Sequence, residues 1–447
     1  MKIKNIKNFF KIKLINHRQN KILYLRAILH VINYIKSSEY RKQRCFIDPS
    51  SDFFFKYKNI TNFFSLPIFY FAKYLEKKNI LISNNNDCNS SMGHIYPEIA
   101  NLQRMRIIDP KYKGKIIWFT TSRKEILGET KILFQSEDFK ILFGGIKRIL
   151  LTFVAIKYPS ISIDGSIGHI SYSLGKKHSD RYVFYDMSKI RAQLISKTKN
   201  YYPLKSKLDE FTNKKNILLQ KLKISKKYII IQIKTFRSNG TLEPLDPKLY
   251  IKTIRYFQNN NYQVVFAGRE KIPEVFLSNS VINYANSKYA TVFNDYLLVG
   301  NSSLVISTPS GFSHLPEVLD KPVLVLNSHF ICEYYGRRTI AVPTLLSRKS
   351  ETFNAAIQHE YICKYGKRCG YFKFDDMYIF HKPTEDEIFM ASKELERLID
   401  EKNLSITPLQ KKIRDSDSFQ LLKYGLSNIS NNYLERHKKF FIKLKEN

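Results

Sequence analysis

Short apolar runs alternate with amphipathic segments along most of the chain. The runs are rich in Ile, Val, Leu and Phe, and they occupy residues 79–83, 114–121, 227–234, 262–268, 304–307 and 322–327. Runs of this length between polar loops are typical of strands buried in a parallel sheet. The intervening segment 246–261 is amphipathic at helical spacing, with Leu249, Ile251, Ile254 and Phe257 on or near one face. Strands that alternate with helices predict an α/β fold with doubly wound parallel sheets.

The alternation falls into two blocks, and a polar, Lys-rich segment at 191–225 between them suits a linker. We therefore predict two Rossmann-like domains that face one another, at 79–190 and 226–382. The basic residues 1–78 predict a helical amino-terminal extension, and 383–447 predict carboxyl-terminal helices. A chain of 447 residues is long enough for this organisation.

Charge is the most unusual feature of the composition. Lys and Arg number 74 against 39 Asp and Glu, which gives a formal net charge of +35, while 43% hydrophobic and 14% aromatic residues indicate a globular chain. The excess favours an anionic partner such as nucleic acid, anionic lipid or a phosphorylated substrate. The alternative is compositional drift, because Lys, Ile and Asn are frequent everywhere. No nucleic-acid-binding signature accompanies the charge, so no nucleic-acid partner is expected.

The cysteines and the apolar segments indicate a cytoplasmic protein. The five cysteines are too few and too scattered for a disulfide framework. The basic start of the chain never becomes an apolar signal-peptide core, and the apolar segment 63–75 is too short to span a bilayer and contains Pro67. The basic, aromatic residues 1–78 fit a peripheral contact with an anionic membrane face, and a helical core segment is the alternative.

The strand at 304–307 is followed by small polar residues that suit an anion site. Ligands in open α/β sheets bind outside the carboxyl ends of strands, where helix amino termini present unpaired N–H groups. Thr308 and Ser310 can donate hydroxyl hydrogen bonds, Gly311 lets a phosphate approach the backbone, and His314 falls in the first helical turn. Pro316 supports a helix that starts between residues 310 and 313. The alternative is that these residues only cap a crossover helix.

Other polar residues share this predicted edge of the sheet. Glu317 could reach a ribose hydroxyl pair, although an acidic residue in a first turn is favourable in any case. After the strand 262–268 come Gly268, Arg269 and Glu270, which suit phosphate and ribose contacts or are surface charge. After the strand 227–234, Lys234 and Arg237 form a candidate second phosphate clamp.

In the first block, two Gly-His pairs follow strands, at Gly93-His94 and Gly168-His169. A histidine at the tip of a strand–loop–helix unit, facing a second domain, is well placed as a general base toward a hydroxyl. We therefore take His94 as the candidate base, with Asp164 in reserve. The alternative for His94 is a hydrogen-bonding role within its loop.

Two segments carry a resemblance to known glycosyltransferases. "PSGFSHLPEVLDKP" (309–322) resembles the donor-site segment of bacterial heptosyltransferases, and "MGHIYPEIA" (92–100) is similar to the amino-terminal loop of the peptidoglycan N-acetylglucosaminyltransferase. The layout from 79 to about 350 also resembles a family of bacterial glycosyltransferase-like proteins. The resemblance implies a GT-B fold in which Ser310, Gly311 and His314 hold the donor diphosphate and His94 lies beside the acceptor. The chain departs from these families at Pro309, where heptosyltransferases have aspartate, and at 84–92, which replaces a glycine run.

Together these features predict a bacterial GT-B glycosyltransferase of envelope or surface polysaccharide synthesis. It would move a sugar from a nucleotide diphosphate sugar to a glycan or lipid-linked hydroxyl, with inversion and without a metal or other cofactor. No Asp-x-Asp motif stands at a strand end. Two alternatives stay open: an enzyme like UDP-N-acetylglucosamine 2-epimerase, and a non-catalytic basic protein that binds nucleic acid or a membrane surface.

Overall fold

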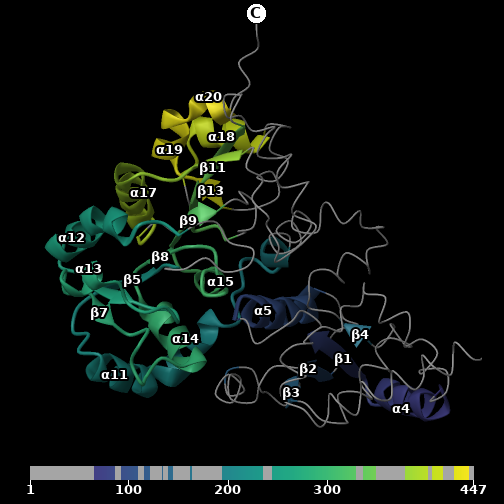
Figure 1. Cartoon of the computed structure of the whole chain (residues 1–447). Helices are drawn as coiled ribbons and strands as arrows, with labels where there is room; N and C mark the ends of the chain where they lie inside the picture. Colours follow the sequence, from purple (N-terminus) through teal and green to yellow (C-terminus); the bar gives the residue numbers. More distant parts are fainter. Residues whose placement is uncertain are drawn as a thin grey trace, which may run out of the picture. The chain divides into compact units, whose positions relative to one another are not determined.

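The computed structural model describes residues 65–85, 92–108, 115–120, 133, 139–143, 162–163, 194–234, 244–328, 336–348, 378–400, 405–415 and 427–441 (Figure 1). They fall into two compact units. Among the described residues, the first unit comprises 65–85, 115–120, 139–143 and 162–163. The second comprises the rest, including 92–108.

The first unit contains a four-stranded parallel sheet and one described helix, α4 (Ser65–Lys77). The strands are β1 (Ile80–Asn85), β2 (Lys115–Thr120), β3 (Phe139–Phe143) and β4 (Ser162–Ile163). Their order across the sheet is β3-β2-β1-β4, and every pair is parallel. This order, with the first strand central and the fourth on its other side, is that of a Rossmann half-sheet.

The second unit is built on a seven-stranded parallel sheet in the order β13-β10-β9-β8-β5-β6-β7. Its strands are β5 (Tyr228–Gln232), β6 (Gln263–Phe266), β7 (Ile282–Asn283), β8 (Val305–Ser307), β9 (Val323–Ser328), β10 (Thr339–Pro343) and β13 (Asn428–Ile429). Ile230 of β5 pairs with Val265 of β6 on one side and Val305 of β8 on the other. The succession β7-β6-β5-β8 repeats the order of the first sheet, so both units carry the same Rossmann-like arrangement.

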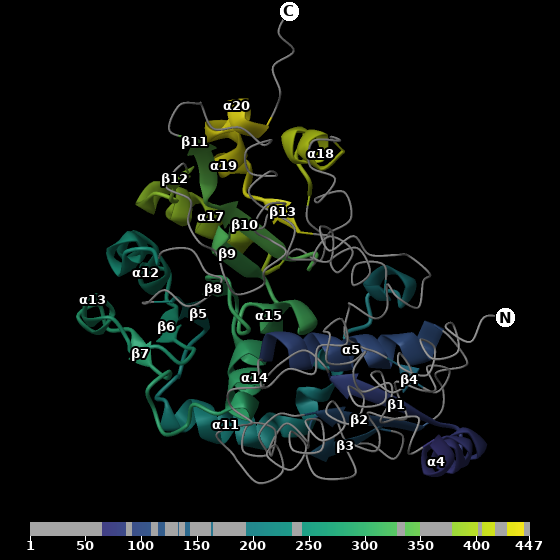
Figure 2. The same cartoon turned by 45° about the vertical axis from the view of Figure 1, so that its right-hand side comes forward.

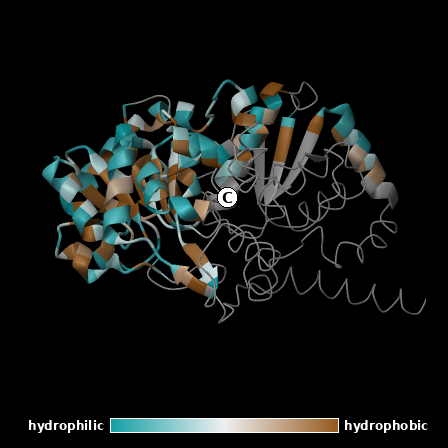
Figure 3. Cartoon of the chain, turned by 90° about the horizontal axis from the view of Figure 1, so that it is seen from above, coloured by the Kyte–Doolittle hydropathy of each residue, from teal (hydrophilic) through white to brown (hydrophobic). Residues whose placement is uncertain are grey.

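Helices cover both faces of the seven-stranded sheet. One face carries α12 (Ile251–Asn259) and α17 (Glu385–Arg397), and the other carries α14 (Val292–Asn301) and α15 (His314–Val318) (Figures 1 and 2). Strand residues alternate between the faces: Ile229 and Ile231 belong to the core under α12 and α17, whereas the Tyr228 hydroxyl donates to Leu298 O of α14. Hydrophilic residues colour much of the outer helical surface (Figure 3).

The remaining described elements of the second unit are short, apart from one long helix. That helix, α5 (Met92–Ile108), lies beside α15 (Figure 2). The others are η3 (Lys205–Lys207), η4 (Asp209–Phe211), α11 (Thr212–Lys221), η5 (Pro247–Tyr250), α13 (Glu274–Leu277), the antiparallel strand pair β11 (Leu345–Arg348) and β12 (Tyr378–His381), α18 (Pro408–Asp415), α19 (Asn431–Arg436) and α20 (Lys438–Phe441).

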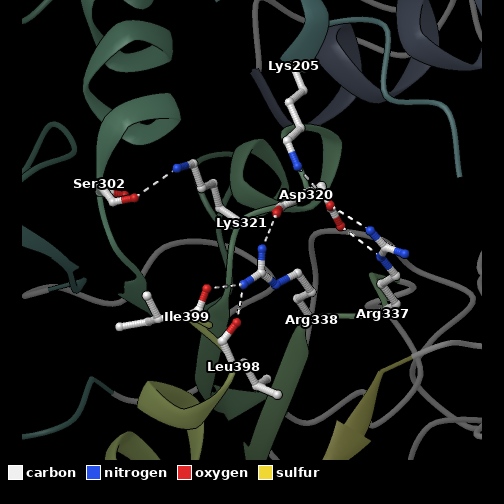
Figure 4. A network of polar contacts seen from close by, with 8 residues as sticks. All are labelled: Lys205, Ser302, Asp320, Lys321, Arg337, Arg338, Leu398 and Ile399. Atoms are coloured by element: carbon white, nitrogen blue, oxygen red, sulfur yellow. Dashed lines mark hydrogen bonds and ion pairs between the residues drawn. The ribbon is translucent and has the colours of Figure 1, made fainter. Parts of the chain in front are cut away.

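A cluster of cations closes the amino-terminal edge of this sheet, where three helices end (Figure 4). Lys321 donates to Ser302 O at the end of α14, and Arg338 donates to Asp320 O after α15 and to Leu398 O and Ile399 O after α17. Cations at these positions offset the negative ends of the helix dipoles.

The Asp320 carboxylate anchors the end of α15 within this cluster. It accepts two hydrogen bonds from the Arg337 guanidinium, at 3.0 and 2.8 Å, and one from Lys205 Nζ at 3.1 Å. Burial alone would raise the pKa of Asp320, but Arg337 and Lys205 hold it below its ordinary value. The carboxyl end of α15 is therefore fixed in position, which also holds the polar residues at its amino end in place.

The predicted α/β class with parallel sheets is confirmed. The predicted strands at 227–234, 262–268 and 304–307 contain β5, β6 and β8, and the predicted strand at 322–327 covers β9 except its last residue. One expectation was wrong. The carboxyl-terminal region is not helical throughout, because Asn428–Ile429 adds a strand to the sheet beside β10. Gly93 and His94 lie in the first turn of α5, and Pro97 stands inside it. The predicted domain boundaries stay predictions.

Candidate functional site

The neighbouring strands β5 and β8 define the place where this sheet would bind a ligand. From β5 the chain adds strands on one side, β6 and β7, and then returns to place β8 on the other. At such a reversal the loops leave the carboxyl ends in opposite directions, which opens a crevice between them. The residues at this point are Gln232 at the end of β5, Lys234 after it, and residues 307–311 at and after the end of β8.

A buried glutamine ties the two strand ends together. The Gln232 side chain shares a sheet face with Ser307, its strand partner. Its Oε1 accepts hydrogen bonds from the hydroxyls of Ser307, at 2.6 Å, and Ser310, at 3.0 Å. The Lys234 backbone N–H donates to Thr308 Oγ1 at 3.1 Å, and Thr308 N–H donates to Gln232 O at 3.1 Å. Since every one of these bonds crosses from one strand end to the other, the loop after β8 has a defined position.

That loop forms a tight turn with two outward amides. Ser313 Oγ accepts from Ser310 N–H at 3.2 Å and donates to Ser310 O at 2.6 Å, which closes the turn on itself. Among the described residues, no acceptor lies in hydrogen-bonding geometry to the N–H groups of Gly311 or Phe312. Adjacent unpaired amides on a turn form an anion-binding concavity, so this turn suits a phosphate group.

His314 begins the short helix α15, one residue later than the sequence predicted. Its Nδ1 lies 3.1 Å from Glu317 Oε2. The Glu317 side chain is fully buried, and its Oε1 accepts from Gly336 N–H at 2.9 Å and Thr339 Oγ1 at 3.3 Å. Because a carboxylate can only accept here, the imidazole carries a proton on Nδ1. Glu317 thus orients His314.

Gly336 is required beside this carboxylate. A Cβ at position 336 would lie 2.6 Å from Thr339 Oγ1 and 3.2 Å from Glu317 Oε1. A side chain there would displace the Thr339 hydroxyl that donates to Glu317 and would crowd the carboxylate that orients His314.

Arg269 lies at the end of β6, on the same edge of the sheet. Its guanidinium is 51% exposed and donates to Gly268 O at 3.1 Å and to Asp295 Oδ2 at 2.9 Å. Gly268 has φ of +109°, and a Cβ there would meet Gln232 Cγ at 3.1 Å, so glycine is needed where β6 meets β5. Asp295, a buried residue of α14, therefore holds the Arg269 guanidinium at the rim of the sheet.

Asp295 is the buried group behind Arg269. It lies in the first turn of α14, and its Oδ1 accepts from the Tyr284 hydroxyl at 2.8 Å. Burial raises the pKa of Asp295 to about 6, although Arg269 and Tyr284 both act to lower it. Burial and the neighbouring Asp295 raise the pKa of Tyr284. A carboxylate that is costly to ionise and yet holds an exposed arginine at a ligand edge is a candidate functional group.

The structure describes some of the remaining predicted site residues and leaves others outside the described ranges. Glu270 is partly exposed after β6, and its carbonyl accepts from Asn286 Nδ2 at 3.1 Å. Asp164 and Arg237 lie outside the described residues. His94 is described as a backbone position in the first turn of α5.

Helix α5 carries His94 toward the same edge. Near its start, the Tyr96 hydroxyl donates to Val292 O at 3.0 Å, at the start of α14. Farther along, Arg104 lies over the Tyr202 ring, which also contacts Arg337 at the other end of α15. Helix α5 therefore runs in the same direction as α15, and its first turn lies toward the edge that carries His314.

Sequence reasoning missed Gln232, Asp295 and Tyr284. Gln232 did leave a signal, because it is a polar residue inside the apolar run 228–233. Asp295 and Tyr284 meet only through the tertiary fold. Within the described residues, no three His, Cys, Asp or Glu side chains gather as metal ligands would. None of the helices in those ranges is long and apolar enough to cross a membrane.

No protein-family model matches the chain, and no curated protein matches it in sequence. Among solved structures it is similar to the E. coli heptosyltransferase WaaC with ADP-2-deoxy-2-fluoro heptose, at 12% identity and a TM-score of 0.37, over 59% of this chain and 92% of that one. It is also similar to a glycosyl transferase family 9 protein from Veillonella parvula, at 11% identity and a TM-score of 0.40, over 71% and 97% of the two chains. A third is the wall teichoic acid polymerase TagF, at 11% identity and a TM-score of 0.32, over 84% and 96%.

Proposed function

We propose that the chain is a glycosyltransferase of the GT-B type that uses a nucleotide diphosphate sugar. The observation that carries the proposal is the turn after β8. It lies at the reversal point of a Rossmann-ordered sheet, it presents the Gly311 and Phe312 amides, and Gln232 fixes it through Ser310. The resemblance of 309–322 to a heptosyltransferase donor segment agrees with this position.

The donor diphosphate would bind across the ends of β5, β6 and β8. In the proposal, the amides of Gly311 and Phe312 and the hydroxyl of Thr308 bind one phosphate, and Ser310 holds the turn in place through Gln232. Lys234, Arg237 and Arg269 supply positive charge, and His314 binds the diphosphate as an imidazolium that donates its Nε2–H to a phosphate oxygen. These groups act where negative charge grows as the diphosphate leaves, which is the largest electrostatic contribution such a site can make. Gly268 and Glu270 line the side of the site nearest the ribose.

Transfer would proceed by direct displacement. The acceptor hydroxyl oxygen bonds to the anomeric carbon, the bond from that carbon to the phosphate oxygen breaks, and the electron pair leaves with the diphosphate. The hydroxyl proton passes to a base, for which His94 is our first candidate and Asp164 our second. Displacement from the opposite face inverts the anomeric centre.

The proposal assigns donor binding to 226–382 and acceptor binding to 79–190, joined by 191–225. The acceptor is a glycan or lipid-linked hydroxyl in envelope or surface polysaccharide synthesis. The protein acts in the bacterial cytoplasm, with a peripheral contact at the inner face of the membrane. The net charge of +35 is consistent with a diphosphate substrate and an anionic surface.

Thermal unfolding in the presence of ADP, GDP or UDP tests the proposal. A ligand that binds the folded chain at about a hundred times its Kd stabilises it by about 2.7 kcal/mol. We expect one diphosphate to raise the unfolding temperature, and we expect Ser310→Ala to reduce its affinity about tenfold, because the Gln232 bond is lost. Ser278→Ala is the matched control, since that hydroxyl is on an exposed helix end and bonds only to Glu274 O and Val275 O.

Absence of any diphosphate effect, or equal affinity in Ser310→Ala and Ser278→Ala, would reject the donor site. Incubation of the chain with the matching nucleotide sugar and no acceptor then separates the two enzyme classes. Formation of a C2 epimer would replace the transferase with the epimerase alternative.

A further inference from the structure

Helix α4 of the first unit presents aromatic rings to solvent. Phe69 is 40% exposed, Tyr70 65% and Tyr74 54%. The opposite side of the helix is buried through Ala72 and Leu75, and the helix packs on β1. These three aromatic side chains therefore lie on the side of α4 away from its buried residues Ala72 and Leu75.

The three rings share their face with lysines. Successive helical residues are about 100° apart, so Phe69, Lys73, Lys77, Tyr70 and Tyr74 follow one another around a single arc of the helix surface. Lys73 and Lys77 lie between the rings on this arc, and both are exposed. In Figure 3 the rightmost ribbon helix, α4, carries hydrophilic and hydrophobic colours side by side. We call these five residues the α4 face.

The clustering of the rings sets α4 apart from the rest of the described chain. Among all the described residues, nine large apolar side chains are exposed, and three of these nine are on α4, a helix of 13 residues. Single exposed apolar residues are ordinary, whereas a contiguous set on one face marks an interaction surface.

The charge of the helix indicates what the surface meets. Lys73 and Lys77 on the helix, with Lys78 directly after it, outnumber Glu76, the only acidic residue of the helix. Lys73 Nζ lies 2.6 Å from the Glu76 carboxylate. Aromatic rings with a polar edge settle at the headgroup level of a bilayer, and lysines on the same face are attracted to anionic lipid. A surface that binds a groove of another protein is typically an apolar stripe without charges, and a surface that binds a polynucleotide typically carries a denser row of cations.

We propose that the α4 face docks on an anionic phospholipid surface, with the helix axis along the membrane and the aromatic rings among the headgroups. The proposal names the surface for the peripheral membrane contact that belongs to the proposed function. It concerns attachment and not transfer, so each can fail without the other.

Sedimentation of the full chain with vesicles tests the docking. The vesicles are phosphatidylcholine alone or phosphatidylcholine mixed with phosphatidylglycerol. The variants are a triple change of Phe69, Tyr70 and Tyr74 to Ser, and a double change of Lys73 and Lys77 to Gln. The matched control changes Ile217, Leu277 and Ile406 to Ser, since these side chains are comparably exposed on the second unit.

We expect the wild type and the control to bind the anionic vesicles and to bind neutral vesicles at least tenfold more weakly. Both α4 variants should lose about tenfold in affinity for anionic vesicles, with salt weakening the wild type further. Circular dichroism verifies that the variants are folded, and unchanged nucleotide binding separates attachment from the donor site. Equal binding by the wild type and the α4 variants, no binding by the wild type, or a change only in self-association or RNA binding would overturn the proposal.

Discussion

The contact between Glu317 and His314 allows the sharpest test of the donor site. Glu317→Gln keeps the volume of the side chain and an oxygen that can accept from Gly336 N–H. It removes the carboxylate oxygen that lies 3.1 Å from His314 Nδ1. Hydrogen bonds to charged groups contribute about 1.5–3 kcal/mol, so the variant loses up to that amount of the energy that orients the imidazole.

If His314 contacts the diphosphate, binding must restore the ring orientation at that cost. We expect the Kd for the stabilising nucleoside diphosphate to rise by up to about tenfold to a hundredfold in Glu317→Gln. Isothermal calorimetry measures the Kd in a double-mutant cycle with His314→Ala. Because Glu317 acts through His314, adding Glu317→Gln to His314→Ala should change the Kd little. Full additivity of the two effects would refute this reasoning.

Three further predictions concern the surroundings of the site. Asp295→Asn removes a carboxyl group whose pKa burial raises from 3.8 to about 6. As pH rises from 4 to 6, denaturant titrations should therefore show wild-type stability falling relative to the variant by on the order of 3 kcal/mol. A difference in stability that does not change with pH would contradict this prediction. Burial, with Lys205 and Arg338, lowers the pKa of Lys321 from 10.5 to about 8, so wild-type stability should rise relative to Lys321→Met as pH increases from 8 to 10.5. Denaturant titrations of the wild type and Lys321→Met across this pH range measure the difference, and a constant difference would contradict the prediction. Gly268→Ala forces a side chain at φ of +109° against Gln232, so chemical unfolding should show a loss of about 1–3 kcal/mol, and an unchanged midpoint would argue against the close approach.

The strands of the second sheet could be predicted because each is a short apolar run. β5, β6, β8 and β9 are buried on both faces, which leaves a continuous hydrophobic signal in the sequence. Asn428–Ile429 gave no such signal, because a two-residue edge strand is defined by the neighbour that it pairs with and not by its own pattern. Helix α5 forms although Gly93 and Pro97 are poor helix residues, and its packing against α15 offsets their cost.

Some of the site residues could likewise be predicted from the sequence, and others could not. Thr308, Ser310, Gly311 and His314 stand in one local motif after a strand, so sequence could bring them together. The partners that position them come from distant segments. Gly336 is 19 residues from Glu317, and Asp295 is 26 residues from Arg269. Only the sheet order brings these pairs together, and no local pattern records it.

Hydrogen exchange of the 308–314 turn measures the central claim most directly. The backbone amides of Gly311 and Phe312 should exchange readily in the free chain and become protected when the stabilising nucleoside diphosphate is added. Gln232→Leu, which removes the acceptor of Ser310, should abolish most of that protection. Protection confined to other segments, or none at saturating diphosphate, would contradict a donor site at the ends of β5 and β8.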